Sequence, residues 1–215
     1  MSGATRLLVP AVLIALLGCA SRRVDLTLPP PTPEASYSAV LSGSLTWHGK
    51  GIPITGGCAV DPLQGIRLEL RDTLGMTRLL LLVNAKECRL VDPAAGLVST
   101  WSSPGRDIPW ASEDLIFLFL GHRPPGLTRL TVRTGRPMLE ASWKNGLGKV
   151  TAELEPLEGG ACPFRQAVVM GPGAARLKLN WTSVLAASFP DDAFDPPSMA
   201  LKPVGADRLL SEIQP

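Results

Sequence analysis

The sequence has few of the side chains on which most enzymes and nucleic-acid-binding proteins depend. Only 5% of its residues are aromatic, histidine occurs twice, and the 21 basic and 19 acidic residues form no block of like charge. A chain without a basic block offers no surface that follows a phosphate backbone, so nucleic acid is not expected as a partner. His48 and His122 lie in different elements without a Cys-x-x-Cys or His-x-x-x-His partner, so no metal site is expected.

Motifs of catalysis and of cofactor binding are missing from the sequence as well. It contains no Gly-x-Ser-x-Gly elbow, no Walker loop and no dinucleotide fingerprint. The adjacent acids Glu113 and Asp114 are typical of a helix start, and Glu153 and Glu155 are typical of the outer face of a strand. We therefore expect no enzyme activity and no cofactor.

The longest apolar run lies at the N-terminus. It extends from Leu7 to Leu17, well short of the roughly 20 residues that a membrane-spanning helix needs, and it is typical of an export signal. It ends in Leu16-Leu17-Gly18-Cys19, which resembles the lipobox of bacterial lipoproteins. That resemblance implies that residues 1–18 are removed and that Cys19 is acylated and anchors the protein to a membrane.

The residues on either side of the main domain have their own composition. Under the sorting rule known for enteric bacteria, Ala20 in place of Asp after the acylated cysteine implies the outer membrane, with the domain facing the periplasm. Residues 19–36 are rich in proline and lack periodicity, which is typical of an extended tether. Residues 186–215 are rich in proline and aspartate, and we expect a loop-rich extension there.

Residues 37–185 are dominated by alternation of apolar and polar side chains, the period of a half-buried strand. The alternation is clearest in Tyr37–Trp47, Ile66–Leu70 and Leu177–Trp181. Weaker segments are Ile52–Val60, Arg78–Asn84, Cys88–Asp92, Leu97–Trp101, Pro137–Lys144, Lys149–Leu157 and Phe164–Met170. Short turn-like pieces separate them, which predicts a mainly β fold: a single curved antiparallel half-barrel of about ten strands in a meander.

A short helix is predicted near residues 112–120. Ser112 is the expected N-cap, acids follow in the first turn, and Gly121 stands where a C-terminal glycine would. The helix is apolar nearly all round and must be covered on most sides, so we expect it to act as a plug or lid in the mouth of the sheet. Leu115, Ile116 and Phe119 are its expected inward residues.

The inward face of the predicted sheet is apolar and low in aromatics, so its interior is expected to be incompletely filled and able to hold an apolar ligand. The alternative is that aliphatic side chains simply fill the core. The predicted cavity residues are Leu41, Leu45, Ile66, Leu68, Leu70, Leu177, Leu179 and Trp181.

Several segments together resemble the LolB-like family of outer-membrane lipoproteins. They are Arg67–Leu70, Asp72-Thr73-Leu74-Gly75, Cys88–Asp92, Phe119-Leu120-Gly121 and Arg176–Trp181. The resemblance implies a half-open barrel with a helical lid whose cavity receives the acyl chains of lipoproteins or lipids. It also implies a periplasmic lipoprotein carrier as donor and a transfer that uses no nucleotide.

The same resemblance implies a protruding loop that touches the membrane. Leu74 and Met76 occupy that loop here, and Thr73 stands where the family often has proline. An ordinary hairpin whose leucine packs on the core is the alternative.

Two questions stay open from the sequence. Among Cys58, Cys88 and Cys162, either two pair, with Cys58–Cys88 the least favoured pair, or all three remain reduced. The alternative function is a structural or scaffolding envelope lipoprotein that uses its barrel as a protein-docking module.

Overall fold

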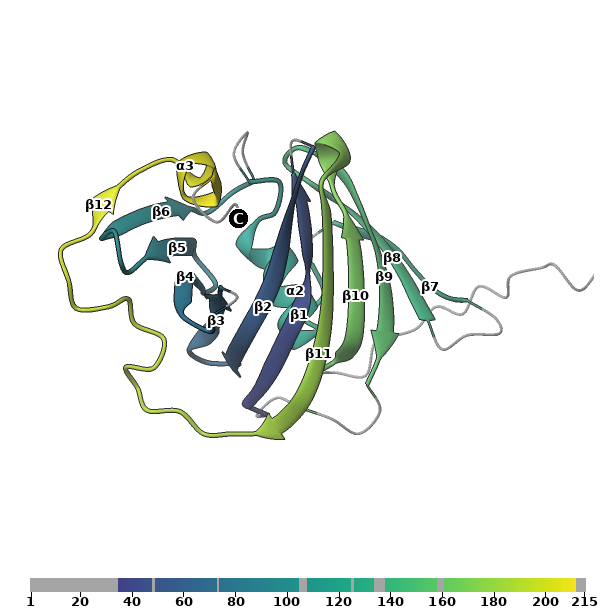
Figure 1. Cartoon of the computed structure of the whole chain (residues 1–215). Coiled ribbons are helices and arrows are strands. Elements are labelled where there is room, and N and C mark those ends of the chain that lie inside the picture. The colour runs from purple at the N-terminus through teal and green to yellow at the C-terminus, as the bar shows by residue number, and fades with distance from the viewer. Residues whose placement is uncertain are drawn as a thin grey trace, which may run out of the picture.

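The computed structural model describes residues 35–47, 49–72, 74–104, 108–124, 126–133, 138–157 and 161–211. Within these ranges the strands form a single, strongly curved sheet, and the longer of the α-helices lies inside its curve (Figure 1). The strands are β1 Tyr37–Trp47, β2 Lys50–Asp61, β3 Gly65–Arg71, β4 Thr77–Val83, β5 Cys88–Asp92, β6 Leu97–Trp101, β7 Leu127–Arg133, β8 Met138–Asn145, β9 Gly148–Pro156, β10 Phe164–Met170, β11 Arg176–Ala186 and β12 Lys202–Pro203. The helices are α2 Ser112–Leu120, the 3₁₀ turn η1 Pro172–Ala174 and α3 Ala206–Ser211.

The sheet consists of two antiparallel meanders that meet in its middle. Its order is β12-β6-β5-β4-β3-β2-β1-β11-β10-β9-β8-β7, so the first strand pairs with β11. The expected single meander is therefore wrong in connectivity, because the link from β6 to β7 crosses from one edge of the sheet to the other and carries α2. The fold class, a curved and mainly antiparallel half-barrel with a short helix, is confirmed.

The sheet has 12 strands, and the two that the sequence did not predict are β7 and β12. In β7 a register shift between Leu127 and Arg129 interrupts the alternation that would have indicated a strand. In β12 only Lys202 and Pro203 pair, and they do so in parallel with β6. A pair that short leaves no periodic pattern in the sequence.

The register places the apolar side chains of neighbouring strands on the concave face. Leu41 stands opposite Gly56 on one side and Trp181 on the other, and Leu68 stands opposite Leu81. Residues directly opposite in an antiparallel pair point to the same face. The main hydrophobic core therefore lies between the concave face and α2.

Two glycines let the central strands approach one another closely. A Cβ on Gly43 would lie 1.9 Å from the carbonyl oxygen of Lys178, and one on Gly56 would lie 1.7 Å from that of Glu69. Glycine in a strand interior often marks a bend or a close backbone approach. At these positions in β1 and β2, only glycine fits without displacing the neighbouring strand.

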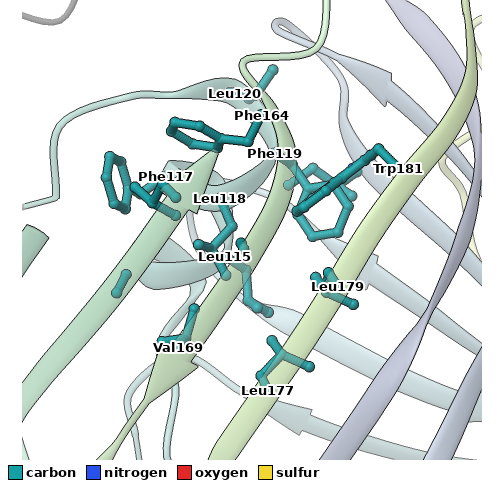
Figure 2. Close-up of a cluster of buried hydrophobic side chains, with 14 of the residues drawn as sticks. Leu115, Phe117, Leu118, Phe119, Leu120, Phe164, Val169, Leu177, Leu179 and Trp181 are labelled. Atoms are coloured by element: carbon teal, nitrogen blue, oxygen red, sulfur yellow. The ribbon is translucent and has the colours of Figure 1, made fainter. Parts of the chain in front are cut away.

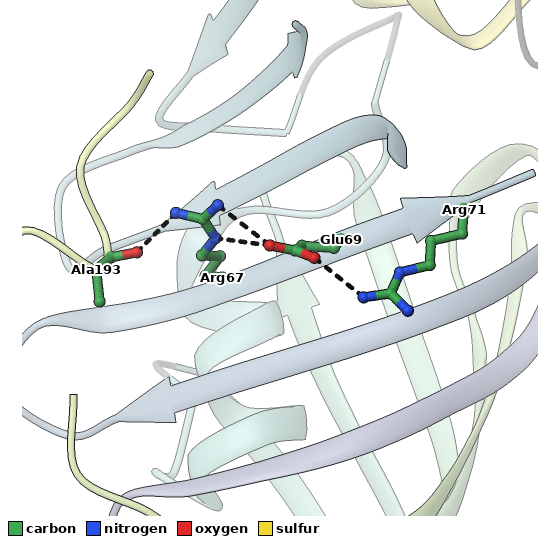
Figure 3. A network of polar contacts seen from close by, with 4 residues as sticks. All are labelled: Arg67, Glu69, Arg71 and Ala193. Atoms are coloured by element: carbon green, nitrogen blue, oxygen red, sulfur yellow. Dashed lines mark hydrogen bonds and ion pairs between the residues drawn. The ribbon is translucent and has the colours of Figure 1, made fainter. Parts of the chain in front are cut away.

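The C-terminal extension packs against the sheet. Arg67 Nη1 donates a hydrogen bond of 2.9 Å to the carbonyl oxygen of Ala193, and Arg67 is itself paired with Glu69 on the convex face of β3 (Figure 3). Farther along, Leu201 packs against a small buried cluster of Leu80, Leu82 and Val91. These leucines of β4 face away from the barrel interior. The extension covers them, so the convex face has a small apolar cluster that is separate from the main core.

The chain then turns around the edge of the sheet. After β12 pairs with β6, α3 places the fully buried Leu209 against Leu79, Leu90 and Leu97. These residues lie on the concave side of β4, β5 and β6. Residues 187–201 contain no helix or strand, whereas the last described residues continue the sheet and cover its concave side.

Candidate functional site

An apolar cavity lies between the concave face of the sheet and the segment that contains α2. Its volume is about 100 Å³. The cavity is lined by Leu45, Trp47, Ile54, Leu68, Leu70, Leu81, Leu90, Trp101, Ile108, Pro109, Trp110, Leu115, Phe119, Leu177 and Leu179. Among the described residues that line it, none is charged. A cavity of this kind stays dry when closed and accepts apolar groups.

Five of the predicted cavity residues line this space: Leu45, Leu68, Leu70, Leu177 and Leu179. Leu41, Ile66 and Trp181 are not among the lining residues; they are buried in the main core. The reason is the position of α2, whose C-terminal half occupies the part of the barrel that contains these three residues. There the ring of Phe119 lies 5.3 Å from that of Trp181 in an edge-to-face contact.

The cavity lining is mostly aliphatic, but it includes more aromatic side chains than the sequence indicated. Trp47, Trp101, Trp110 and Phe119 all border the cavity. Low aromatic content in the whole sequence did not mean low content at the site, because burial gathers these large apolar side chains in the interior. Trp47 stands in the clearest alternating segment and could have been found from it, whereas Trp110 reaches the cavity through an irregular loop.

Helix α2 covers the concave face from within the barrel. Figure 2 shows its Leu115, Phe117 and Phe119 close to side chains of β10 and β11. Phe117 makes edge-to-face contacts with Trp143 and Phe164, at 5.3 and 5.9 Å between ring centroids. Leu115 and Phe119 line the cavity, and Ile116, also predicted to face it, instead packs partly buried against the main core.

The N-terminus of α2 is held by a buried carboxylate. Asp114, 2% exposed, accepts hydrogen bonds from Trp143 Nε1 at 2.5 Å, from Asn145 Nδ2 at 3.0 Å and from the Ala111 backbone N–H at 2.8 Å. Ala111 is the N-cap, one residue before the expected Ser112. The acid in the first turn satisfies the free N–H in place of a capping hydroxyl.

The C-terminus of α2 is held by Tyr37. Its hydroxyl donates a 2.7 Å hydrogen bond to the carbonyl oxygen of Phe119, one of the last carbonyls of the helix. Burial raises the pKa of Tyr37 well above its usual value, and the neighbouring Cys162 and Cys58 raise it further. The phenol is therefore neutral and remains a donor. Both ends of α2 are thus fastened to strands of the sheet.

The predicted membrane-touching loop projects into solvent. Leu74 is 84% exposed and Met76 65% exposed, so the alternative in which this leucine packs on the core is excluded. Asp72 Oδ1 accepts hydrogen bonds from the backbone N–H groups of Leu74 and Met76, and its Oδ2 pairs with Arg78 at 2.9 Å. The Met76 N–H is the largest of the causes that hold the pKa of Asp72 below its usual value. The charged Asp72 therefore orders a tip that presents two apolar side chains.

The cysteines Cys58, Cys88 and Cys162 are buried and form no disulfide. Burial raises the pKa of Cys58 and of Cys88 to about 12 and also raises that of Cys162. Thiols with such pKa values are neutral and poorly reactive. Of the pairings that the sequence left open, the structure contains none.

Some sequence predictions lie outside the described residues. These are the export signal of residues 1–18, the acylated Cys19 and nearly all of the tether. In the described ranges, none of the helices combines the length and apolar character needed to cross a membrane. Those ranges also hold no group of three or more histidine, cysteine or acidic residues suited to a metal ion.

Solved structures share this fold at low sequence identity. A LolA superfamily protein from Nitrosomonas europaea matches with a TM-score of 0.50 and 10% identity over 79% of this chain and 94% of that chain. A DUF1329 family protein from Desulfovibrio piger follows at 0.48 and 10%, over 78% and 92%. A domain from Vibrio parahaemolyticus, titled as an outer membrane lipoprotein-sorting protein, matches at 0.45 and 12%, over 75% and 89%.

The match to the Nitrosomonas europaea protein shows that the chain shares the fold of that protein, a curved half-barrel with a short helix. At such identities the likeness concerns the fold alone. No protein-family model matches the sequence, and no curated protein matches it.

Proposed function

We propose that this protein binds fatty acyl chains of lipoproteins or lipids in the cavity under α2 and delivers them to the outer membrane. Its place there would be secured by acylation of Cys19. The observation that carries the proposal is the cavity itself, whose described lining residues are all apolar and which is covered by α2. Solved proteins of the same fold include one titled as lipoprotein-sorting, which agrees with this use of the half-barrel.

The size of the cavity implies that α2 moves during binding. About 100 Å³ is less space than the cavity of about 150 Å³ that holds a benzene molecule in a known engineered case. An acyl chain of a dozen or more methylenes therefore enters only if the lid shifts outward. Each methylene that leaves water contributes about 0.8 kcal/mol, which can offset the loss of lid contacts.

The test is binding of a fluorescent acyl probe to a Leu70→Asp variant. Leu70 is only partly buried and lines the cavity, so a charge there opposes an alkyl chain with little effect on the core. Keeping even two methylenes in water weakens affinity more than about tenfold. The matched control is Leu185→Asp, the same change at a side chain that is 65% exposed and does not line the cavity.

Unchanged probe affinity in Leu70→Asp would overturn the proposal. If the aspartate variant does not fold, the same affinity is measured for Leu70→Trp, which fills the space without adding charge and should also weaken probe binding. Anchoring is tested separately by labelling with palmitate, which should be incorporated into the unmodified chain and lost in Cys19→Ser.

Depletion of the protein in its own organism separates transport from scaffolding. We expect lipoproteins to accumulate at the inner membrane, because their acyl chains would have no acceptor. The scaffolding alternative predicts normal lipoprotein localisation after depletion.

A further inference from the structure

The tip of the β8–β9 hairpin combines features that the acyl-binding cavity does not explain. Lys144 and Lys149 stand directly opposite one another in the ladder, and both are exposed. Like charges directly opposite in a sheet destabilise it. None of the described residues forms an ion pair with either lysine, so nothing in that part of the structure offsets the repulsion.

Farther along the same hairpin the charge has the opposite sign. Glu140 stands directly opposite Glu153, nearer the other end of both strands. If one lysine of the first pair and one glutamate of the second were exchanged, each pair would join opposite charges. The exposed face of the hairpin instead separates the two signs and concentrates positive charge at the tip.

An apolar residue stands between the two lysines in the sequence. Leu147, in the turn, is 44% exposed. Its backbone N–H donates to Asn145 Oδ1 at 3.1 Å, and Asn145 Nδ2 donates at 2.9 Å to the carbonyl oxygen of Pro109, a residue of the cavity wall. The tip is therefore held beside the cavity by its own side-chain amide.

The ladder register places the β3–β4 tip at the same end of the sheet. Arg71 of β3 and Asn145 of β8 both precede turns at the end where β1 leads into β2. That tip presents the exposed Leu74 and Met76, and Leu70, just before it, lines the cavity. Apolar side chains thus project from two hairpin tips at the same end of the sheet, one on each half. Leu70 of the first hairpin lines the cavity, and Asn145 of the second contacts Pro109 of the cavity wall.

We propose that the β8–β9 tip, defined by Lys144, Leu147 and Lys149, is a second membrane contact that binds the phosphate groups of anionic phospholipids. The lysines attract the negatively charged surface, and Leu147 enters the interface beside them. Two paired cations that have no counter-ion among the described residues fit a ligand that supplies the negative charge. The inference deepens the proposed function, because contact through both tips would set the cavity against the bilayer that receives the acyl chain.

The experiment measures vesicle binding by the chain that starts at Ala20, which lacks the acylation site and contains every described residue. Vesicles of phosphatidylcholine alone are compared with vesicles that also contain phosphatidylglycerol. Each lysine near an anionic surface contributes about fivefold to binding, so Lys144→Glu/Lys149→Glu should bind the anionic vesicles at least about 25-fold more weakly. Added salt should weaken binding of the unmodified chain.

The matched control is Lys86→Glu/Arg165→Glu, which changes the net charge equally at the opposite end of the sheet. It should bind as the unmodified chain does. Equal binding to both kinds of vesicle, no binding to either, or an unaltered double lysine variant would each overturn the inference. No binding to either would point to an acidic protein surface as the partner of the tip.

Acyl-probe binding to the same samples separates this inference from the proposed function. The double lysine variant should retain the probe affinity of the unmodified chain, because neither lysine lines the cavity. Vesicle binding without probe binding would overturn the proposed function and leave the membrane contact standing.

Discussion

Replacement of Asp114 tests whether a buried carboxylate holds the lid in place. Asp114→Ala removes the acceptor of three N–H groups, of which Trp143 Nε1 and the Ala111 N–H belong to buried residues. A buried donor left without a partner costs about 1–3 kcal/mol, so these two together cost about 2–6 kcal/mol. Part of this loss is offset because a buried charge is removed, and we expect a net loss of about 3 kcal/mol of unfolding free energy.

Asp114→Asn isolates the role of the second oxygen. The amide keeps the shape of the side chain and one acceptor, so the Ala111 N–H and Asn145 Nδ2 retain their partner while Trp143 Nε1 faces an NH₂ group. One lost hydrogen bond to a charged group costs about 1.5–3 kcal/mol. We therefore expect Asp114→Asn to lose no more unfolding free energy than Asp114→Ala.

The assay is urea unfolding followed by tryptophan fluorescence, together with the association rate of the acyl probe. Both variants should unfold at lower urea than the unmodified chain, and probe association should be faster because α2 is held less firmly. Glu113→Ala, an exposed neighbour in the same helix, is the control and should change stability by less than about 0.5 kcal/mol. The same urea midpoint for all of these proteins would refute the reasoning.

Three further outcomes are expected. Tyr37→Phe should lower the unfolding free energy by about 1–2 kcal/mol, since the Phe119 carbonyl loses its donor in a buried site; denaturation measures it. Stability should fall as pH rises above about 8.5, because Cys58 and Cys88 ionise there in the unfolded chain but only near pH 12 in the folded one. Gly56→Ala should destabilise the sheet by more than about 2 kcal/mol, because its Cβ meets a backbone oxygen of β3 at 1.7 Å.

Each of these has a result that would contradict it. A Tyr37→Phe variant as stable as the unmodified chain would show that the hydrogen bond from Tyr37 does not hold the C-terminus of α2 in place. Rapid labelling of Cys58 and Cys88 by a thiol reagent in the folded protein at pH 8 would contradict their burial and raised pKa values. A Gly56→Ala variant with native stability would mean that β2 and β3 can separate there freely.

The parts of the fold that local patterns determine were predictable. The helix was expected near residues 112–120 and lies at Ser112–Leu120, because an apolar run bounded by acids and a glycine needs no distant partner to be recognised. Its N-cap was misplaced by one residue, because Asp114 bonds back to the Ala111 N–H. Strand β7 was not predicted because of its register shift. A shift of one residue exchanges the side chains that face inward and outward, so the alternating pattern that reveals a strand is broken there.

The candidate site was only partly predictable, because neighbours far apart in sequence decide it. The concave face of β3 and β11 was evident from alternation, and Leu68, Leu70, Leu177 and Leu179 do line the cavity. Whether a concave residue meets empty space or α2 depends on where the helix lies. Leu41 and Trp181 therefore have the same pattern in the sequence as the lining residues, yet they lie in the filled core.

By itself the sequence determined the mainly β class, the inward and outward faces of most strands and the position of the helix, because periodicity and local capping chemistry are read along the chain. The tertiary structure alone decided that β1 pairs with β11, that the few aromatics gather inside and that the C-terminal segment wraps the sheet edge. It also decided that the β3–β4 and β8–β9 tips lie at the same end of the sheet. These features depend on contacts between segments distant in sequence, and such contacts stabilise the protein only once the sheet has folded around α2.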